Sequence, residues 1–256
     1  MTGAAARGAG AARPRLTLYY ALGGGLGHLT RARKVLAALG IDDAVLLTAS
    51  RFGGDPRVTG PHRALKVPRR LGHDRDAFRA WLEPLLRDAD EILVDSFPGG
   101  ILGELCGLTL PRATYIARRL RWDVYERRLD GPLPHYDVTF EVEPLGVGEP
   151  LELLQCEIGE PLTDEPHWLV VHAGPQHELD ALIEHAREAP KLIVADVYPV
   201  APHLAHAERV ITAGGFNAVH ENARWRERHT IVPFPRALDD QFARAQWAVG
   251  CSTSRV

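Results

Sequence analysis

Short apolar runs alternate with longer amphipathic segments along most of this 256-residue chain. Each run has the length of a buried strand, and each amphipathic segment repeats its apolar side chains at helical spacing. This pattern predicts strands over 16–22, 44–48, 64–67, 91–94, 112–116, 168–172, 192–195, 209–212 and 230–232, and helices over 29–39, 77–86, 101–105, 178–187, 203–207, 217–225 and 240–249. Strands that alternate with helices indicate parallel sheets covered by helices on both faces.

The segment between the two halves has a different character. Residues 141–166 contain four prolines together with acidic residues and glycines, which break any long period. We therefore predict a first domain over 15–142, a linker over 143–166 and a second domain over 167–256. Residues 1–14 are rich in Ala, Gly and Arg, and we expect them to form a disordered tail.

Two glycine-rich turns follow predicted strands, one in each half. The first is Gly23-Gly24-Gly25-Leu26-Gly27-His28, and the second is Gly214-Gly215-Phe216-Asn217. A strand–turn–helix unit of this kind aims backbone N–H groups and the positive end of a helix at one point, which suits a phosphate. Two such turns in separate halves predict an α/β protein in which two Rossmann-like domains face a cleft.

The first turn matches neither the spacing of a dinucleotide-binding loop nor that of a Walker A loop. Its glycines leave room around His28, which begins a helix at the carboxyl edge of the first strand. Ligands of open α/β sheets bind at that edge. A helix N-terminus disfavours the imidazolium, so we expect a neutral His28 that can accept a proton. The alternative is a histidine that only caps the helix.

Composition narrows the classes of function. The net charge of −3, from 30 basic and 33 acidic residues, implies no strong field for nucleic acid. Three widely spaced cysteines argue against a disulfide framework or a zinc site and fit a reducing compartment. The twelve histidines show no metal-binding spacing, so we predict no metal.

We expect a cytoplasmic protein, because the first residues lack the apolar region of a signal peptide and no apolar run approaches the roughly 20 residues that span a bilayer. Arginines at 118–121 and 127–128 form a dense cluster. Solvated faces are the plainer interpretation of this cluster. The alternative is an anionic or membrane-surface acceptor, which would bring the protein to the inner face of the membrane.

Three groups of motifs carry a family resemblance. Gly24-Gly25-Leu26-Gly27-His28-Leu29-Thr30-Arg31 resembles the N-terminal glycine loop of nucleotide-sugar glycosyltransferases of the GT-B fold, the lipid II-forming N-acetylglucosaminyltransferase group and its relatives. Asp95-Ser96-Phe97-Pro98-Gly99-Gly100 is similar to the inner-cleft segment of their first domain. Residues 211–221, followed by Val232-Pro233-Phe234-Pro235 and Asp239-Asp240-Gln241, resemble their donor-binding signature. The resemblance extends from about Leu16 to Val249.

The resemblance implies a metal-independent hexosyltransferase without a cofactor. It would move a sugar from a nucleotide-diphosphate sugar, with UDP as the expected nucleotide, to an acceptor hydroxyl. His28 would be the catalytic base. The cleft or acceptor side would hold Gly25, Gly27, Asp95 and Ser96, and the donor would be bound by Gly214, Gly215, Phe216, Asn217, Glu221, Asp240 and Gln241.

Among these donor-binding residues, the two glycines would let the backbone approach the diphosphate. Glu221 would accept hydrogen bonds from the ribose diol, because one carboxylate can accept two of them. Asp240 and Gln241 would reach the hydroxyls of the sugar. Helix capping by Asp239 or Asp240 is the alternative for this last segment.

The second half also departs from the family pattern. His172-Ala173-Gly174-Pro175-Gln176 stands where relatives have a Gly-Ser type of phosphate loop, and Pro175 has no N–H to donate. Only 40 positions separate Gly174 from Gly214, so we expect a reduced second domain that lacks one βα unit. Two alternatives to sugar transfer stay open: a nucleotide-sugar hydrolase similar to that of the pseudaminic acid pathway, and a nucleotide-sugar-binding protein without catalysis.

Overall fold

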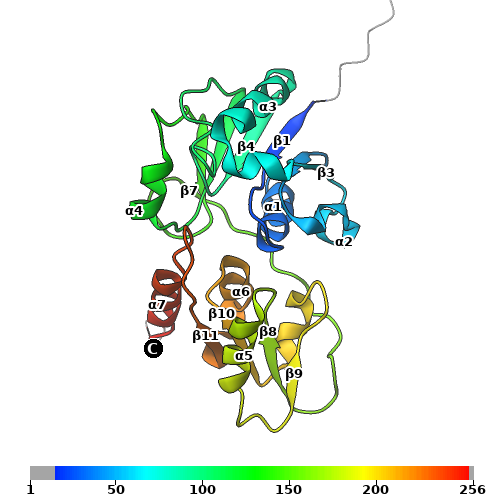
Figure 1. Ribbon diagram of the computed structural model, residues 1–256. Coiled ribbons are helices and arrows are strands. Elements are labelled where there is room, and N and C mark those ends of the chain that lie inside the picture. Colours follow the sequence, from blue (N-terminus) through cyan, green and yellow to red (C-terminus); the bar gives the residue numbers. More distant parts are fainter. Residues whose placement is uncertain (1–14, 254–256) are drawn as a thin grey trace, which may run out of the picture.

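The computed structural model describes residues 15–253 and contains two parallel sheets, one in each half of the chain (Figure 1). The first sheet has the order β3-β2-β1-β4-β5-β6-β7 and the second the order β11-β10-β8-β9. The strands are β1 (Thr17–Tyr20), β2 (Val45–Thr48), β3 (Arg63–Lys66), β4 (Glu91–Asp95), β5 (Arg112–Ala117), β6 (Val138–Glu141), β7 (Glu149–Pro150), β8 (Trp168–Val171), β9 (Leu192–Val194), β10 (Arg209–Ala213) and β11 (His229–Val232). All pairings are parallel, which confirms the predicted α/β class.

The α-helices are α1 (Gly27–Ala38), α2 (Pro56–Thr59), α3 (Arg75–Asp88), α4 (Trp122–Tyr125), α5 (Gln176–Glu184), α6 (Phe216–Glu221) and α7 (Gln241–Thr253). The described part of the chain also contains five 3-10 helices: Arg51–Gly54, Arg69–His73, Glu126–Arg128, Ala201–His206 and Ala223–Arg228. Among residues 15–253, no helix is both long enough and apolar enough to cross a membrane.

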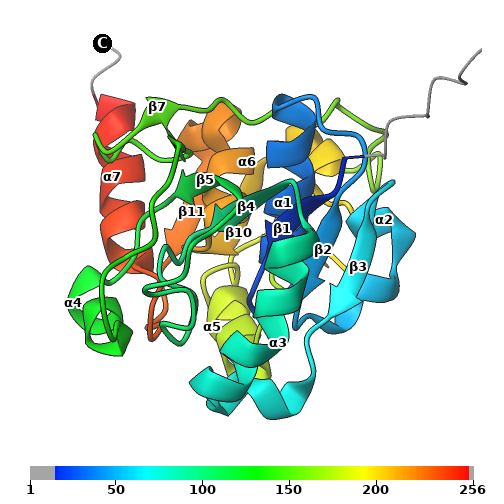
Figure 2. The same cartoon turned by 90° about the horizontal axis from the view of Figure 1, so that it is seen from above.

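The first sheet has an apolar core on each of its faces, and alternate residues of β1 supply both. Leu18 and Tyr20 pack with the apolar side of α3, whereas Tyr19 packs with the apolar side of α1. Figure 2 shows the two helices on opposite sides of the sheet. Every residue of β1 is buried, because side chains point alternately to two covered faces.

Three predicted helices differ from the structure, and the one predicted over 203–207 is the 3-10 helix Ala201–His206. Residues 101–105 form turns, since Gly100, Gly103 and Gly107 have positive φ angles that interrupt a helix. The helix predicted over 217–225 ends at Glu221, where Asn222 donates a side-chain hydrogen bond back to the Ala218 carbonyl, and a 3-10 helix follows.

The first sheet is also longer than the apolar pattern predicts. The apolar pattern predicts neither β6 nor β7. The second of these strands, β7, pairs with β6 and lies inside the segment that we expect to be linker. Only two residues form β7, and one of them is Pro150, so no hydrophobic period marks it.

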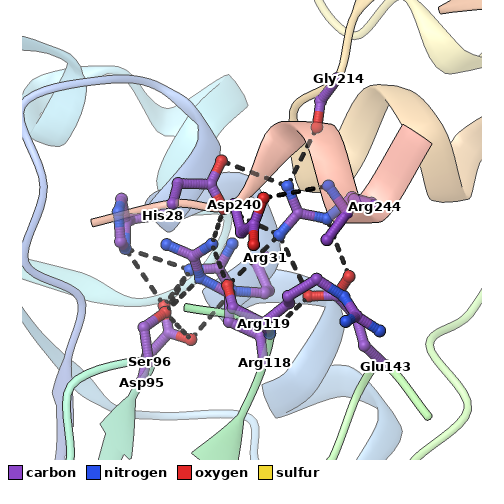
Figure 3. A network of polar contacts seen from close by, with 12 residues as sticks. His28, Arg31, Asp95, Ser96, Arg118, Arg119, Glu143, Gly214, Asp240 and Arg244 are labelled. Carbon is purple, nitrogen blue, oxygen red and sulfur yellow. Dashed lines mark hydrogen bonds and ion pairs between the residues drawn. The ribbon is translucent and has the colours of Figure 1, made fainter. Parts of the chain in front are cut away.

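The two halves are joined by a buried network of charged side chains (Figure 3). Arg244 on α7 is fully buried, and its Nε donates to Glu143 Oε1 at 2.8 Å. The same guanidinium donates to Asp239 at 2.8 Å and to the Gly214 carbonyl at 2.9 Å. Asp239 also accepts a hydrogen bond from Arg118, which follows β5 in the first half. The network therefore ties the loop after β10 and the start of α7 to the carboxyl edge of the first sheet.

Candidate active site

A cavity of about 850 Å³ lies between the two halves. From the first half it is lined by the first glycine turn and α1, and from the second by segments that follow β8, β9 and β10 and by α6. These segments leave the carboxyl ends of parallel strands, which is where α/β sheets bind ligands. The cavity is thus the cleft that the two glycine turns predicted.

His28 is the second residue of α1 and lines this cavity. Its ring lies directly over Gly23, where a Cβ atom would come within 2.0 Å of His28 Cδ2. Gly23 is therefore needed for the ring to adopt this position. The ring stacks against Phe97 at a centroid distance of 6.1 Å, and its Nδ1 lies 3.3 Å from Asp95 Oδ2.

The charges around His28 favour a neutral ring beside an ionised carboxylate. Burial lowers the pKa of His28, and the Arg31 and Arg118 charges act in the same direction against the hydrogen bond to Asp95. Burial would raise the pKa of Asp95, but the Arg31 charge and the His28 hydrogen bond outweigh it and hold that pKa well below its ordinary value. The direction for His28 agrees with the sequence expectation, although burial is the main cause.

Asp95 ends β4 and Ser96 follows it, and both are fully buried beneath the histidine rather than exposed to the cavity. Arg31 binds Asp95 through two parallel hydrogen bonds, from Nε at 2.9 Å and from Nη2 at 2.6 Å. Such a bidentate pair fixes the carboxylate plane. Of the predicted cleft residues, Asp95 and Ser96 therefore lie behind the cavity wall, whereas Gly25 and Gly27 line the cavity directly.

Arg118 changes the interpretation of the arginine cluster over 118–121. Its side chain is buried, and its Nε donates to Ser96 Oγ at 2.6 Å. Burial lowers the pKa of Arg118, although the nearby Asp239 charge acts in the opposite direction. Arg118 follows β5 at the same sheet edge as His28 and lines the cavity, so it is part of the cleft and not of an outer basic surface.

The two glycine turns touch each other across the cleft. Asn217 Nδ2 donates to the Gly27 carbonyl at 3.0 Å, and the Arg31 guanidinium lies over the Phe216 ring at 5.0 Å. Gly215 faces open space in the cavity. Gly214 does not line the cavity; a Cβ there would come within 3.0 Å of Gln241, so this glycine allows α7 to approach closely.

The remaining predicted donor residues differ in where they point. Glu221 lines the cavity, and its Oε1 accepts a hydrogen bond from Lys34 of α1 at 2.6 Å. Gln241 also lines the cavity, and its Oε1 accepts from the Phe234 N–H at 3.0 Å. Asp240 instead caps α7 through the Ala243 N–H at 3.0 Å, and the adjacent Asp239 faces the cavity. The capping alternative thus describes Asp240, because its carboxylate meets the first turn of the helix.

An ion pair lies beside the loop 172–176 that departs from the family pattern. Glu178 on α5 lies beside Gly174 and accepts two hydrogen bonds from Arg236, one of them at 2.6 Å. His172 Nε2 lies 3.3 Å from the same carboxylate. Hydrogen bonds from Arg236 lower the pKa of Glu178, and burial lowers the pKa of His172. The position where relatives were expected to hold phosphate therefore already pairs a carboxylate with a guanidinium.

Sequence reasoning missed five charged residues of this cleft and its supports: Lys34, Glu143, Glu178, Arg236 and Arg244. It also interpreted Arg118 as part of a surface cluster. The sheet-edge argument that identified His28 applies equally to Arg118, which lies two residues after a predicted strand. No comparable signal exists for the other five, which pack against residues distant in sequence.

Comparison with known proteins establishes the fold. No protein-family model matches the sequence, and no curated protein matches it. Several solved structures do match. The Streptomyces sp. SF2575 glycosyltransferase SsfS6 has a TM-score of 0.61 and 13% identity over 93% of this chain and 86% of that one. The glycosyltransferase SnogD from Streptomyces nogalater has a TM-score of 0.58 and 13% identity, with the same coverage of both chains. The spinosyn rhamnosyltransferase SpnG, complexed with thymidine diphosphate, has a TM-score of 0.54 and 12% identity over 93% of this chain and 85% of that one.

The fold is that of GT-B glycosyltransferases. This confirms the fold that the sequence motifs implied. Within residues 15–253, no group of three or more His, Cys, Asp or Glu side chains is placed to hold a metal ion. Metal independence, the identity of the donor and the roles of individual residues stay predictions.

Proposed function

We propose that this protein is a glycosyltransferase that moves a sugar from a nucleotide-diphosphate sugar to an acceptor hydroxyl, with His28 as the base. The observation that carries the proposal is the position of His28, which contacts Asp95 at the wall of a cavity shared by two α/β halves and whose pKa is lowered by burial. The fold supports it, because the three solved structures named above are glycosyltransferases. We take UDP as the first nucleotide to test, and the reaction is proposed to need no metal.

The proposed reaction needs a proton acceptor on one side and positive charge on the other. As the acceptor oxygen attacks the anomeric carbon, its proton passes to His28 Nε2, and the sugar–phosphate bond breaks with its electrons going to the diphosphate. The growing imidazolium is stabilised by the ionised Asp95 beside Nδ1. A positioned base of this kind contributes about 10² to 10⁴ in rate.

The donor would lie against the second half of the cavity. Its diphosphate would lie near Gly215 and Arg236, where the backbone is open and a guanidinium lines the wall. Glu221 would accept hydrogen bonds from the ribose diol, and Lys34 would hold that carboxylate in place through Oε1. Gln241 and Asp239, both at the cavity wall near the start of α7, would face the sugar hydroxyls.

A thermal-shift panel of UDP, dTDP, GDP and CMP with their sugars is the first experiment, because a ligand that binds only the folded state raises its apparent stability. Turnover of the stabilising nucleotide sugar is then measured with His28→Ala. We expect nucleotide binding within about twofold of the unchanged protein and a loss of about 10² to 10⁴ in kcat. Full activity in His28→Ala would rule out its role as base.

Product analysis separates transfer from its alternatives. A transferase needs an acceptor, so the release of free sugar should be slow in its absence. Free sugar formed at the full rate in water would instead identify a hydrolase. Nucleotide binding without turnover of any nucleotide sugar would identify a binding protein.

A further inference from the structure

One nitrogen of Arg31 faces more acceptors than it has protons to donate. Nη2 lies 2.6 Å from Asp95 Oδ2, 3.0 Å from Ser96 Oγ and 3.1 Å from His28 Nδ1. A terminal guanidinium nitrogen carries two protons. The contact with the ionised Asp95 is the shortest of the three and takes the first proton. Ser96 and His28 therefore compete for the second (Figure 3).

The outcome of this competition decides which ring nitrogen of His28 carries its proton. If Nδ1 accepts from Arg31, the neutral ring keeps its proton on Nε2, which then cannot take a proton from an acceptor hydroxyl. If Ser96 accepts instead, Nδ1 keeps the proton and donates it to Asp95 Oδ2, 3.3 Å away. The Nε2 lone pair is then available. The two tautomers thus have opposite chemical abilities.

Ser96 is arranged to win the competition. Its Oγ accepts from Arg118 Nε at 2.6 Å and from Arg31 Nη2 at 3.0 Å, and it donates to Asp95 Oδ1 at 3.2 Å. These three bonds use both lone pairs and the one proton of a hydroxyl. The hydroxyl is therefore saturated only when Arg31 donates to it.

The backbone of Ser96 supports the same conclusion. Its φ angle is 74°, and among residues 15–253 no other non-glycine residue has a positive φ. Residues with a side chain rarely adopt this backbone conformation, and those that do cluster at functional sites. The residue is held there by its own N–H, which donates to the Ile116 carbonyl at 3.0 Å, and by its carbonyl, which accepts from the Tyr115 hydroxyl at 3.0 Å. A glycine would relieve the backbone but would lack the hydroxyl.

We propose that Ser96 sets the tautomer of His28 by accepting the second Nη2 proton of Arg31, so that His28 carries its proton on Nδ1 and keeps the Nε2 lone pair available. Ser96 is a positioning residue, because it acts through Arg31 and His28. The catalytic value of this tautomer depends on the proposed function, whereas the tautomer itself does not.

The test is a long-range ¹H–¹⁵N correlation spectrum of the full chain with ¹⁵N-labelled histidine at pH 8, in which the His28 signals are assigned by their loss in His28→Ala. We expect the Nδ1–H pattern in the unchanged protein and a shift toward the Nε2–H pattern in Ser96→Gly, which removes the hydroxyl without backbone strain. The matched control is Ser50→Gly, another buried serine that lies outside this network and does not line the cavity, and we expect it to leave the His28 pattern unchanged.

Activity provides the second readout. Once the substrate is known, Ser96→Gly should lower kcat by up to about 10²-fold, the smaller contribution of a general base, with nucleotide binding within about twofold. An Nε2–H pattern in the unchanged protein would overturn the inference without any variant, even if Ser96→Gly did not fold. An unaltered Nδ1–H pattern in folded Ser96→Gly would also overturn it. A tautomer shift together with no turnover by the unchanged protein would support the inference and reject the proposed function.

Discussion

The two sides of the cleft hold their charges in different ways. On the side of α1, Arg31 and Asp95 are both buried, and two hydrogen bonds from the Arg31 guanidinium hold the Asp95 carboxylate. On the side of α5, Glu178 is buried but its partner Arg236 has a side chain that is 32% exposed. The first arrangement is fixed before any ligand arrives. The second is open enough for a ligand to replace one of the partners, which suits a base on one side and an anion site on the other.

The largest expected difference between the two sides is in stability. Asp95→Asn keeps the shape of the side chain but leaves the buried Arg31 charge without its counter-ion, and breaking a buried pair in this way costs about 3–5 kcal/mol. Glu178→Gln makes the same change beside a partly exposed partner and should cost about 1 kcal/mol or less. The melting temperature would then fall by about 6–20 °C in the first variant and by a few degrees in the second. Equal losses would show that the two sides are equally fixed.

The next expected effect concerns ligand binding by the more open side. If Glu178 competes with the donor phosphates for Arg236, Glu178→Gln should tighten the binding of the nucleoside diphosphate by about 3- to 10-fold, which corresponds to roughly 1 kcal/mol. Isothermal titration calorimetry measures this directly. Glu184→Gln removes a charge from an exposed position on the same helix and should leave the dissociation constant unchanged. Weaker binding in Glu178→Gln would mean that the carboxylate positions Arg236 rather than competes for it.

The contrast between the two sides also explains how far the sequence could predict them. Most of the strands, both glycine turns and His28 follow from apolar periods and from the meeting of parallel strands at one edge. Arg244 and Glu143 are 101 positions apart, and neither has a local pattern that distinguishes it from a solvated charge. Asp239 and Asp240 are neighbours with the same chemistry. Only the backbone direction at the start of α7 decides that Asp240 caps the helix while Asp239 faces the cavity.

The smallest expected effect is the response of the fixed side to pH. The pKa of His28 lies below the ordinary 6.5, so the ring stays neutral and able to accept a proton as the pH falls to that value. Asp95, Arg31 and Arg118 keep their charges over the same range, because the pKa of Asp95 is strongly lowered and the guanidinium groups do not titrate there. The rate should therefore change by less than about twofold between pH 8 and 6.5 and decline only at lower pH.

The same lowered pKa carries a stability consequence with a defined sign. Below pH 6.5 the unfolded chain takes up a proton on His28 before the folded chain does, so this contribution to stability is present above 6.5 and declines as the pH falls toward the folded pKa. Burial also lowers the pKa of His172, so this histidine on the donor side should likewise stay neutral down to pH 6.5. The Michaelis constant for the donor should therefore change as little as kcat down to pH 6.5.

A kcat profile with its midpoint at or above 6.5 would contradict the buried, neutral base. A flat kcat with a donor Michaelis constant that rises below pH 7.5 would confine the pH sensitivity to the more open side.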